Sequence, residues 1–326
     1  MDATNLSQPT RQSQQSQPAR QTKPSERPLQ ALVECVPNFS EGRRPQVVAE
    51  IVSAIGSVEG VRVLDFTSDA AHNRSVVTFI GPPAAVVEGA FRGIARAQEL
   101  IDMRTHTGEH PRLGATDVVP FVPISGVTMA ECVELAVALG ERVGRELQIP
   151  VFLYEQAARC ESRRNLADIR RGEYEGLFAK TATPEWIPDF GPASVNPTAG
   201  ATVIGARMPL IAFNVNLTTS DVAVAKRIAK AVRASSGGLA YVKALGVMLD
   251  DKGVAQVSMN LVNYVGTPVA RVMEAVRREA ARWGVGVAES ELIGLIPLDA
   301  VLDVAAYYLQ LPKLERSQVI EARVWE

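Results

Sequence analysis

Apolar and polar residues alternate along some stretches of the chain and recur at helical spacing along others, and these two periods predict its elements. From residue 31 the pattern predicts the order β-α-β-β-α-β in a lengthened form. The predicted elements are strands over 31–37, 61–65, 75–80, 118–124 and 149–154, and helices from 45, over 83–100 and over 129–147. A polar segment rich in Gly, His and Arg, residues 101–116, interrupts this order as a loop.

The same order returns in the second part of the chain, over residues 209–295. The predicted elements are strands over 208–217, 242–249, 254–264 and 286–295, helices over 220–234 and 268–283, and a closing helix over 299–309. The sequence therefore predicts an α+β protein of two ferredoxin-like units, with helices covering one face of each sheet. The two remaining sheet faces either pair with each other or enclose a ligand.

The stretch between these two units has weaker periodicity. Arginines interleave with acidic residues after residue 155, a pattern that predicts a surface helix. Residues 183–200 contain four prolines and two glycines, so we expect irregular backbone there, either a linker or a binding loop. The glycine-rich segment 191–207 has neither a GxGxxG nor a GxxxxGK[ST] pattern, so a nucleotide-phosphate site is not supported.

Composition narrows the class of protein. The 326 residues include 34 Lys+Arg and 36 Asp+Glu, a net charge of -2 that does not favour a nucleic-acid partner. Three cysteines, Cys35, Cys132 and Cys160, fit a reducing compartment rather than a disulfide scaffold. No apolar run is long enough for a membrane span. Residues 1–29 are predicted to form a disordered tail, and a cytoplasmic location is the default expectation.

All three histidines, His72, His106 and His110, lie in predicted loops, where a functional role is more common than on an apolar face. His106-Thr-Gly-Glu-His110 formally matches the H-x-x-E-H zinc pattern, but Gly108 and Pro111 oppose the continuous helix that this pattern needs. The favoured interpretation is a loop that presents His110 as an acid–base group. Glu109 and Asp117 could orient it, and Arg112 could bind an anion. The alternative is a loop whose charges satisfy one another.

Other candidates are polar residues on predicted strands. Asn73 and Arg74 stand at a strand mouth and can donate to a ligand, although turn chemistry explains Asn73 equally well. Asn214 and Asn216 share one face of a strand and so face either solvent or a polar ligand.

Seven co-linear blocks resemble the glutamate formiminotransferase family: Leu32-Val-Glu-Cys-Val-Pro-Asn-Phe-Ser-Glu-Gly42, Gly108-Glu-His-Pro-Arg112, Pro188-Asp-Phe-Gly-Pro192, Gly205-Ala-Arg207, Ala212-Phe-Asn-Val-Asn-Leu217, Ala255-Gln-Val-Ser-Met-Asn260 and Gly294-Leu-Ile-Pro297. The resemblance runs from about Leu32 to the C-terminus. It implies two ferredoxin-like subdomains, over residues 30–208 and 209–326, whose facing sheets enclose a folate groove. It also implies a homodimer that needs no metal.

The implied reaction moves the formimino group of N-formimino-L-glutamate to N5 of tetrahydrofolate, the co-substrate, in histidine breakdown. The family's catalytic histidine falls on His110. Its folate-binding loop falls on Gly191, Pro192, Ala193, Ser194, Val195, Asn196, Pro197, Thr198, Ala199 and Gly200. Substrate carboxylates call for cations, for which Arg74, Arg112 and Arg207 are the candidates.

Two other functions stay open from the residues. One is a transferase of the same fold that uses N-formyl-glutamate, and the other is a non-catalytic folate-binding protein. The sequence departs from the animal family members at Thr67, which replaces an acid, while Asp69 supplies one nearby.

Overall fold

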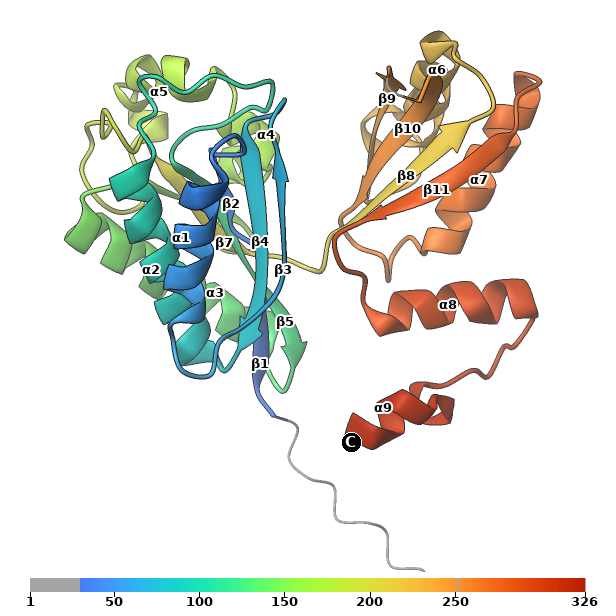
Figure 1. The fold of residues 1–326 in the computed structure, drawn as a ribbon, viewed down its shortest axis with the longest axis horizontal. Coiled ribbons are helices and arrows are strands. Elements are labelled where there is room, and N and C mark those ends of the chain that lie inside the picture. The colour runs from blue at the N-terminus through green and yellow to red at the C-terminus, as the bar shows by residue number, and fades with distance from the viewer. Residues whose placement is uncertain (1–29, 251, 326) are drawn as a thin grey trace, which may run out of the picture.

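The computed structural model describes residues 30–250 and 252–325, and the tail predicted over 1–29 lies outside them. It has a mixed α/β architecture with one seven-stranded and one four-stranded sheet (Figure 1). Residues 207–210 connect the last strand of the first sheet to the first strand of the second. Among the described helices, none is long and apolar enough to cross a membrane.

The first unit contains the predicted order β-α-β-β-α-β and then continues. Its strands are β1 (Leu32–Cys35), β2 (Asn38–Phe39), β3 (Arg62–Asp69), β4 (Arg74–Gly81), β5 (Thr116–Ser125), β6 (Val151–Glu155) and β7 (Thr202–Ala206). Its helices are α1 (Pro45–Gly56), α2 (Pro83–Leu100), α3 (Met129–Arg142), continued by a π-helical segment over Val143–Leu147, α4 (Leu166–Ile169) and α5 (Glu173–Thr181). The sheet runs β3-β4-β1/β2-β5-β7-β6, antiparallel up to β5 and parallel from β5 to β6.

Helices α1, α2 and α3 pack on one face of this sheet and form its main core. The core includes Ile51 and Ile55 from α1, Ile94 from α2, and Phe79 and Phe121 from the sheet, all with exposures of 1% or less. Proline in the first turn starts both α1 and α2, because its fixed φ suits the helix and its missing N–H has no partner to lose. A capping box between Thr128 and Glu131 starts α3.

Strand β7 was absent from the sequence prediction, which treated residues 191–207 as loop or linker. It is inserted between β5 and β6 and pairs in parallel with both. All five of its residues are buried, so it lacks the apolar–polar alternation that marks a half-exposed strand.

The surface helix predicted after residue 155 was also wrong. The chain instead forms a short 3₁₀ turn at Glu161–Arg163 followed by the short helix α4 and then α5. These elements cover part of the second face of the sheet, where Ile169 and Leu177 join Phe152 and Val203 in a separate apolar cluster. Arg163 is consequently buried rather than solvated and pairs with Asp189 at 3.0 Å, and Arg170 is partly buried.

The second unit repeats β-α-β-β-α-β. Its elements are β8 (Ile211–Leu217), α6 (Val222–Val232), β9 (Val242–Leu249), β10 (Val254–Leu261), α7 (Val269–Arg282), β11 (Val287–Ile293) and then α8 (Leu298–Leu309) and α9 (Ile320–Trp325). The strand order is β11-β8-β10-β9, all antiparallel. Helices α6 and α7 cover the apolar face of this sheet, and α8 and α9 extend from its end (Figure 1).

A side-chain hydrogen bond joins the open face of the second sheet to the first unit. Lys243, at the start of β9, donates to Oδ1 of Asn165 at 3.1 Å. Asn165 is also the N-cap of α4, whose backbone N–H at Ala167 it accepts. The start of β9 therefore lies against the elements that cover the second face of the first sheet.

Candidate active site

The loop of residues 101–115, between α2 and β5, is irregular as predicted and packs on the β3–β4 turn. Gly108 makes this approach possible, because a Cβ there would lie 2.4 Å from the carbonyl oxygen of His72. Asn73 fixes the same junction from a left-handed conformation, with φ of 48°. Its Oδ1 accepts from the Gly42 N–H at 3.0 Å and its Nδ2 donates to the Thr107 carbonyl at 2.9 Å.

Asn73 was predicted as a ligand donor. Because its side-chain oxygen and its amino group both bond within the protein, and the residue is only 8% exposed, the structure gives it a bracing role between two loops. The turn interpretation of Asn73 is the one that fits this geometry.

His110 is partly buried, and the structure brings it together with Arg74, as both were predicted for the site. Nη1 of Arg74 donates to Nε2 of His110 at 2.8 Å. Burial lowers the pKa of His110 to about 3, helped by the charges of Arg74 and Arg170 and opposed by a hydrogen bond to the Pro111 backbone. The imidazole is therefore neutral at physiological pH, with Nε2 as a proton acceptor.

Asp117, predicted to orient His110, pairs instead with Arg170. Its Oδ1 accepts from the Leu113 N–H at 3.0 Å, and its Oδ2 forms the ion pair with Nη2 of Arg170. Arg170 was not a predicted site residue, because its segment was read as a surface helix. Its Nε is buried and has no hydrogen-bond partner among the described residues.

His72 lies beside His110 and is paired with the carboxylate of Asp69. Its Nδ1 is 2.7 Å from Oδ2 of Asp69, and its ring meets the His110 ring edge to face with 6.5 Å between centroids. Burial raises the pKa of Asp69, but the hydrogen bonds and charge of His72 outweigh it and leave the pKa below its ordinary value. The acid that the sequence places after Thr67 thus contacts His72, and Glu109 is exposed.

Arg112, predicted to bind an anion from the substrate, is already occupied. Only 6% exposed, it forms ion pairs of 2.6 Å with Glu173 and with Glu175, and it donates through Nε to Nδ1 of His106 at 3.2 Å. Nε2 of His106 lies 3.1 Å from the Asn73 carbonyl. Arg112 therefore links the loop of residues 101–115 (the histidine loop) to α5.

The two histidines of the H-x-x-E-H pattern consequently do not converge. His106 is held by Arg112 and a backbone carbonyl, whereas His110 contacts Arg74. In residues 30–250 and 252–325 no group of three His, Cys, Asp or Glu side chains is arranged to hold a metal ion.

The segment Gly191–Gly200 is anchored along its length rather than being a free linker. Gly191, with φ of 82°, packs against Gly144, and Asn196 folds an Asx turn by accepting the Thr198 and Ala199 N–H groups. The second half contacts the histidine loop, since Thr198 and Ala199 accept from the Met103 and Ala115 N–H groups at 2.8 and 2.9 Å.

The remaining predicted residues lie elsewhere. Asn216 is buried on the open face of the second sheet, where it donates to Glu289 and Glu291 and accepts from Gln256 at 2.8 Å. Asn214 accepts from the Met259 N–H at 3.3 Å. Arg207, at the end of β7, donates to the Met208 carbonyl at 2.9 Å. Within the described residues, no hydrogen bond or ion pair joins these side chains to His110.

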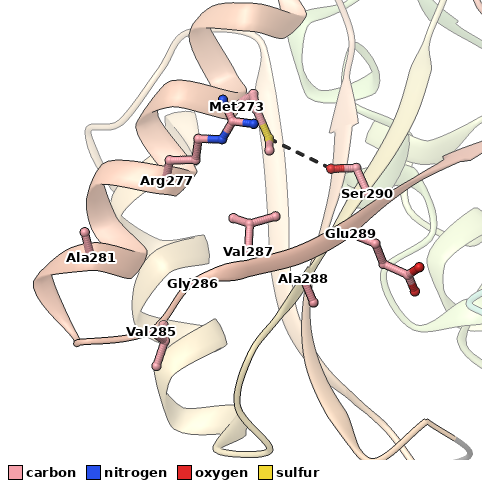
Figure 2. Close-up of a pocket in the computed structure, with 9 residues that line it drawn as sticks. All are labelled: Met273, Arg277, Ala281, Val285, Gly286, Val287, Ala288, Glu289 and Ser290. Atoms are coloured by element: carbon pink, nitrogen blue, oxygen red, sulfur yellow. Dashed lines mark hydrogen bonds between the residues drawn. The ribbon is translucent and has the colours of Figure 1, made fainter.

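A separate pocket lies at the edge of the second sheet, and one of its lining residues, Glu289, accepts a hydrogen bond from Asn216. It lies between α7 and β11 and is lined by Met273, Arg277, Ala281 and residues 285–290 (Figure 2). Arg277 there pairs with Glu274, and Sδ of Met273 faces Oγ of Ser290 at 3.9 Å. The lining contains no histidine or cysteine, so acid–base chemistry of the kind described for His110 is not built there.

Comparison with known families decides how this geometry is interpreted. A model described as "Formiminotransferase domain, N-terminal subdomain" matches residues 32–207, and one described as "Formiminotransferase domain" matches residues 212–324. The chain belongs to the formiminotransferase family. The first match ends at residue 207, where the connection between the two sheets begins, and the second match begins at residue 212, just after it. Together they include the first sheet with His110 and the second with Asn216.

Individual relatives agree with this membership. The chain is 50% identical to "Glutamate formimidoyltransferase" of Streptococcus pyogenes serotype M1 over 89% of its own length and 97% of the relative's. It is 52% identical to the protein of the same name in Thermoplasma acidophilum, over 90% and 97%. It is also 48% identical to "Formimidoyltransferase-cyclodeaminase" of Rattus norvegicus, over 88% of this chain and 54% of that one.

Proposed function

We propose that the protein is a glutamate formimidoyltransferase, which moves the formimino group of N-formimino-L-glutamate to N5 of tetrahydrofolate and releases L-glutamate. Two near full-length relatives carry this name. The observation that carries the proposal is His110, a neutral imidazole whose Nε2 accepts within a cluster of positive charge. We propose that this reaction belongs to histidine degradation and one-carbon metabolism.

The reaction requires a group that first accepts a proton and then returns it. N5 attacks the formimino carbon and forms a new C–N bond, giving a tetrahedral intermediate. His110 takes the N5 proton at Nε2 and delivers it to the glutamate nitrogen as the bond between that nitrogen and the carbon breaks. The products are 5-formiminotetrahydrofolate, glutamate and a neutral imidazole, so His110 is restored in each cycle. Acid–base assistance of this kind contributes about 10²- to 10⁴-fold to the rate.

The lowered pKa of His110 sets the balance of these two steps. A neutral ring is ready to accept at neutral pH, and its conjugate acid is strong, so proton delivery to the leaving nitrogen is favourable. The first transfer is correspondingly harder. It becomes easier when the positive charge near the ring is compensated as substrates bind.

The folate is proposed to lie between the open faces of the two sheets, with the loop Gly191–Gly200 among its contacts. This loop supports the backbone on either side of His110 through Met103 and Ala115, so folate bound there is coupled directly to the histidine loop. Arg207 remains a candidate for the folate carboxylates. We further propose that the protein works in the cytoplasm as a homodimer and uses no metal.

The test is a donor comparison with purified protein. Tetrahydrofolate is incubated with N-formimino-L-glutamate or with N-formyl-L-glutamate, and the folate product is followed by absorbance. We expect product from the formimino donor, and product from the formyl donor alone would overturn the proposal.

The same assay separates an enzyme from a folate-binding protein. His110→Ala should lose at least about 100-fold in turnover. Folate affinity, measured by calorimetry, should change by less than about tenfold. A parent protein that binds folate but transfers nothing from either donor would instead indicate a binding protein.

A further inference from the structure

The two arginines around His110 are unequally paired with carboxylates: the charges of Asp117 and Asp69 both act on Arg74, but neither forms an ion pair with it. Two arginines, Arg74 and Arg170, lie close enough to lower the pKa of the same imidazole, and Arg170 also lowers that of Arg74. The carboxylate of Asp117 forms an ion pair with Arg170. Asp69 acts on Arg74 at longer range but is bonded to His72. Within the described residues, no carboxylate forms an ion pair with Arg74.

The N–H donors of the two arginines that lack a partner also indicate a missing anion. Arg74 is partly buried, and its Nη1 donates to a neutral nitrogen acceptor, Nε2 of His110. Arg170 has a side chain only 16% exposed, and its buried Nε has no partner. Guanidinium groups removed from water require acceptors for their N–H groups, and an anionic acceptor serves them best. Because Asp117 pairs with Arg170 and Asp69 is bonded to His72, Arg74 is left without an ion-pair partner among the described residues, and an external anion completes the site.

We propose that Arg74 and Arg170 form the binding site for the α-carboxylate of the formimino donor, and that this carboxylate takes over the guanidinium that now occupies Nε2 of His110. The inference rests on the proposed function and names the part of the substrate that the site recognises. Arg170 is thereby assigned to substrate binding, and Arg74 to both binding and control of the base.

The chemistry of the donor selects the α-carboxylate over the other anions. Only the Cα atom separates this carboxylate from the nitrogen that carries the formimino group, so the two must lie together beside His110. The glutamate of the folate is separated from N5 by the whole aminobenzoyl group, which places its carboxylates far from the proton transfer. The γ-carboxylate of the donor is two carbons further from the reacting nitrogen than its α-carboxylate.

Removal of Arg74 from Nε2 has two consequences that act in the same direction. The lone pair of Nε2 becomes free to accept the N5 proton. The carboxylate also neutralises positive charge beside the ring, which makes the protonated ring easier to form. The base is therefore activated when the donor is in place, and it is blocked by a hydrogen bond when the site is empty.

The test uses a donor that lacks only the group in question. N-Formimino-4-aminobutyrate is N-formimino-L-glutamate without its α-carboxylate. With the unmodified protein we expect kcat/KM for this analogue to be lower by about 30-fold or more, the usual result of removing one member of a buried charge pair. In Arg170→Gln the natural donor should suffer a similar loss, while the analogue loses little more, so the two changes do not add.

A neighbouring arginine provides the matched control. Arg171 has a side chain 79% exposed and pairs with Asp168, so Arg171→Gln removes the same charge one residue further along without touching the site. It should retain the full difference between the two donors. Arg170→Lys should recover part of the loss. Equal kcat/KM for the two donors with the unmodified protein would overturn the proposal, whether or not the variants fold.

The acceptor distinguishes the folate from the donor as the source of the anion. Tetrahydropteroate is the acceptor without its glutamate, and the effect of this truncation should be the same in the unmodified protein and in Arg170→Gln. If the variant abolished that effect instead, the site would hold a folate carboxylate and the proposal would be wrong.

A binding measurement keeps the test independent of turnover. L-Glutamate should raise the unfolding temperature of the unmodified protein more than 4-aminobutyrate does, and this difference should shrink in Arg170→Gln. No difference between the two ligands would contradict the proposal even if the protein transfers no formimino group.

Discussion

His106 and His110 lie on the same loop, each within hydrogen-bond distance of an arginine, yet their surroundings differ in charge. Arg112, beside His106, is balanced by the carboxylates of Glu173 and Glu175. Arg74, beside His110, has no carboxylate in an ion pair, as described above for residues 30–250 and 252–325. The charge of Arg112 is therefore neutralised within the protein, whereas Arg74 has N–H donors that are available to a ligand. Whether a buried arginine is paired with carboxylates therefore distinguishes a structural role from a binding role more clearly than the residue type does.

The largest expected effect comes from exchanging the two histidines for an isosteric amide. His110→Gln should reduce kcat by about 10²- to 10⁴-fold, because the ring moves the proton. His106→Gln should reduce kcat by less than about tenfold and act mainly on stability, because the ring only connects Arg112 with the Asn73 carbonyl. Steady-state kinetics with saturating substrates measures kcat for both variants. Equal losses of kcat would contradict the different roles proposed for the two histidines.

A change at Arg112 tests the brace itself. Arg112→Met keeps the length of the side chain but leaves Glu173 and Glu175 without their partner, and we expect a loss of about 2 kcal/mol in the free energy of unfolding. The value stays below that of a fully buried pair because the two glutamate side chains are 41% and 63% exposed. Urea denaturation gives the stability, and kinetics gives KM. A raised KM for the formimino donor with unchanged stability would show that Arg112 binds substrate after all.

The last expected effect, spread over several units of pH, is the pH dependence of stability. The pKa values of His106 and His110 are both lowered by burial, in the second case to about 3, so the unfolded chain binds more protons than the folded chain between that pH and the ordinary histidine value. Stability should therefore rise with pH across this window and become independent of these groups above it. In His110→Gln the rise should be shallower. Urea midpoints from pH 4 to pH 7 measure it, and parallel curves for the two proteins would contradict the lowered pKa of His110.

Much of the architecture followed from local pattern. Strand β9 was predicted with its observed bounds, and α2 likewise, because each presents one regular apolar stripe or alternation to a core. The prediction failed for β7, whose residues are buried on both faces, and for the segment around α4, where Arg163 and Arg170 pack inward. Hydrophobic periodicity identifies a helix or strand only when one of its sides is buried and the other faces solvent.

The candidate site was recoverable in part for a similar reason. Gly108 and Pro111, on either side of His110, predicted an irregular loop. Arg74 was predicted at the end of a strand, where ligand-binding residues are common. Nothing local distinguished Arg112 from Arg170: the first was predicted to bind substrate and is paired with acids from α5, and the second was assigned to a solvated helix and contacts Asp117. The partners of both arginines lie more than fifty residues away in the sequence.

The sequence alone determined the two β-α-β-β-α-β units and the irregular loop that holds His110, because backbone propensity and hydrophobic period act over a few neighbouring residues. Only the tertiary structure decided which arginine is neutralised and which is left with an unfilled set of donors. Ion pairing depends on distances between segments that are remote in the chain, and those distances exist only after folding has brought α5, β4 and β5 together.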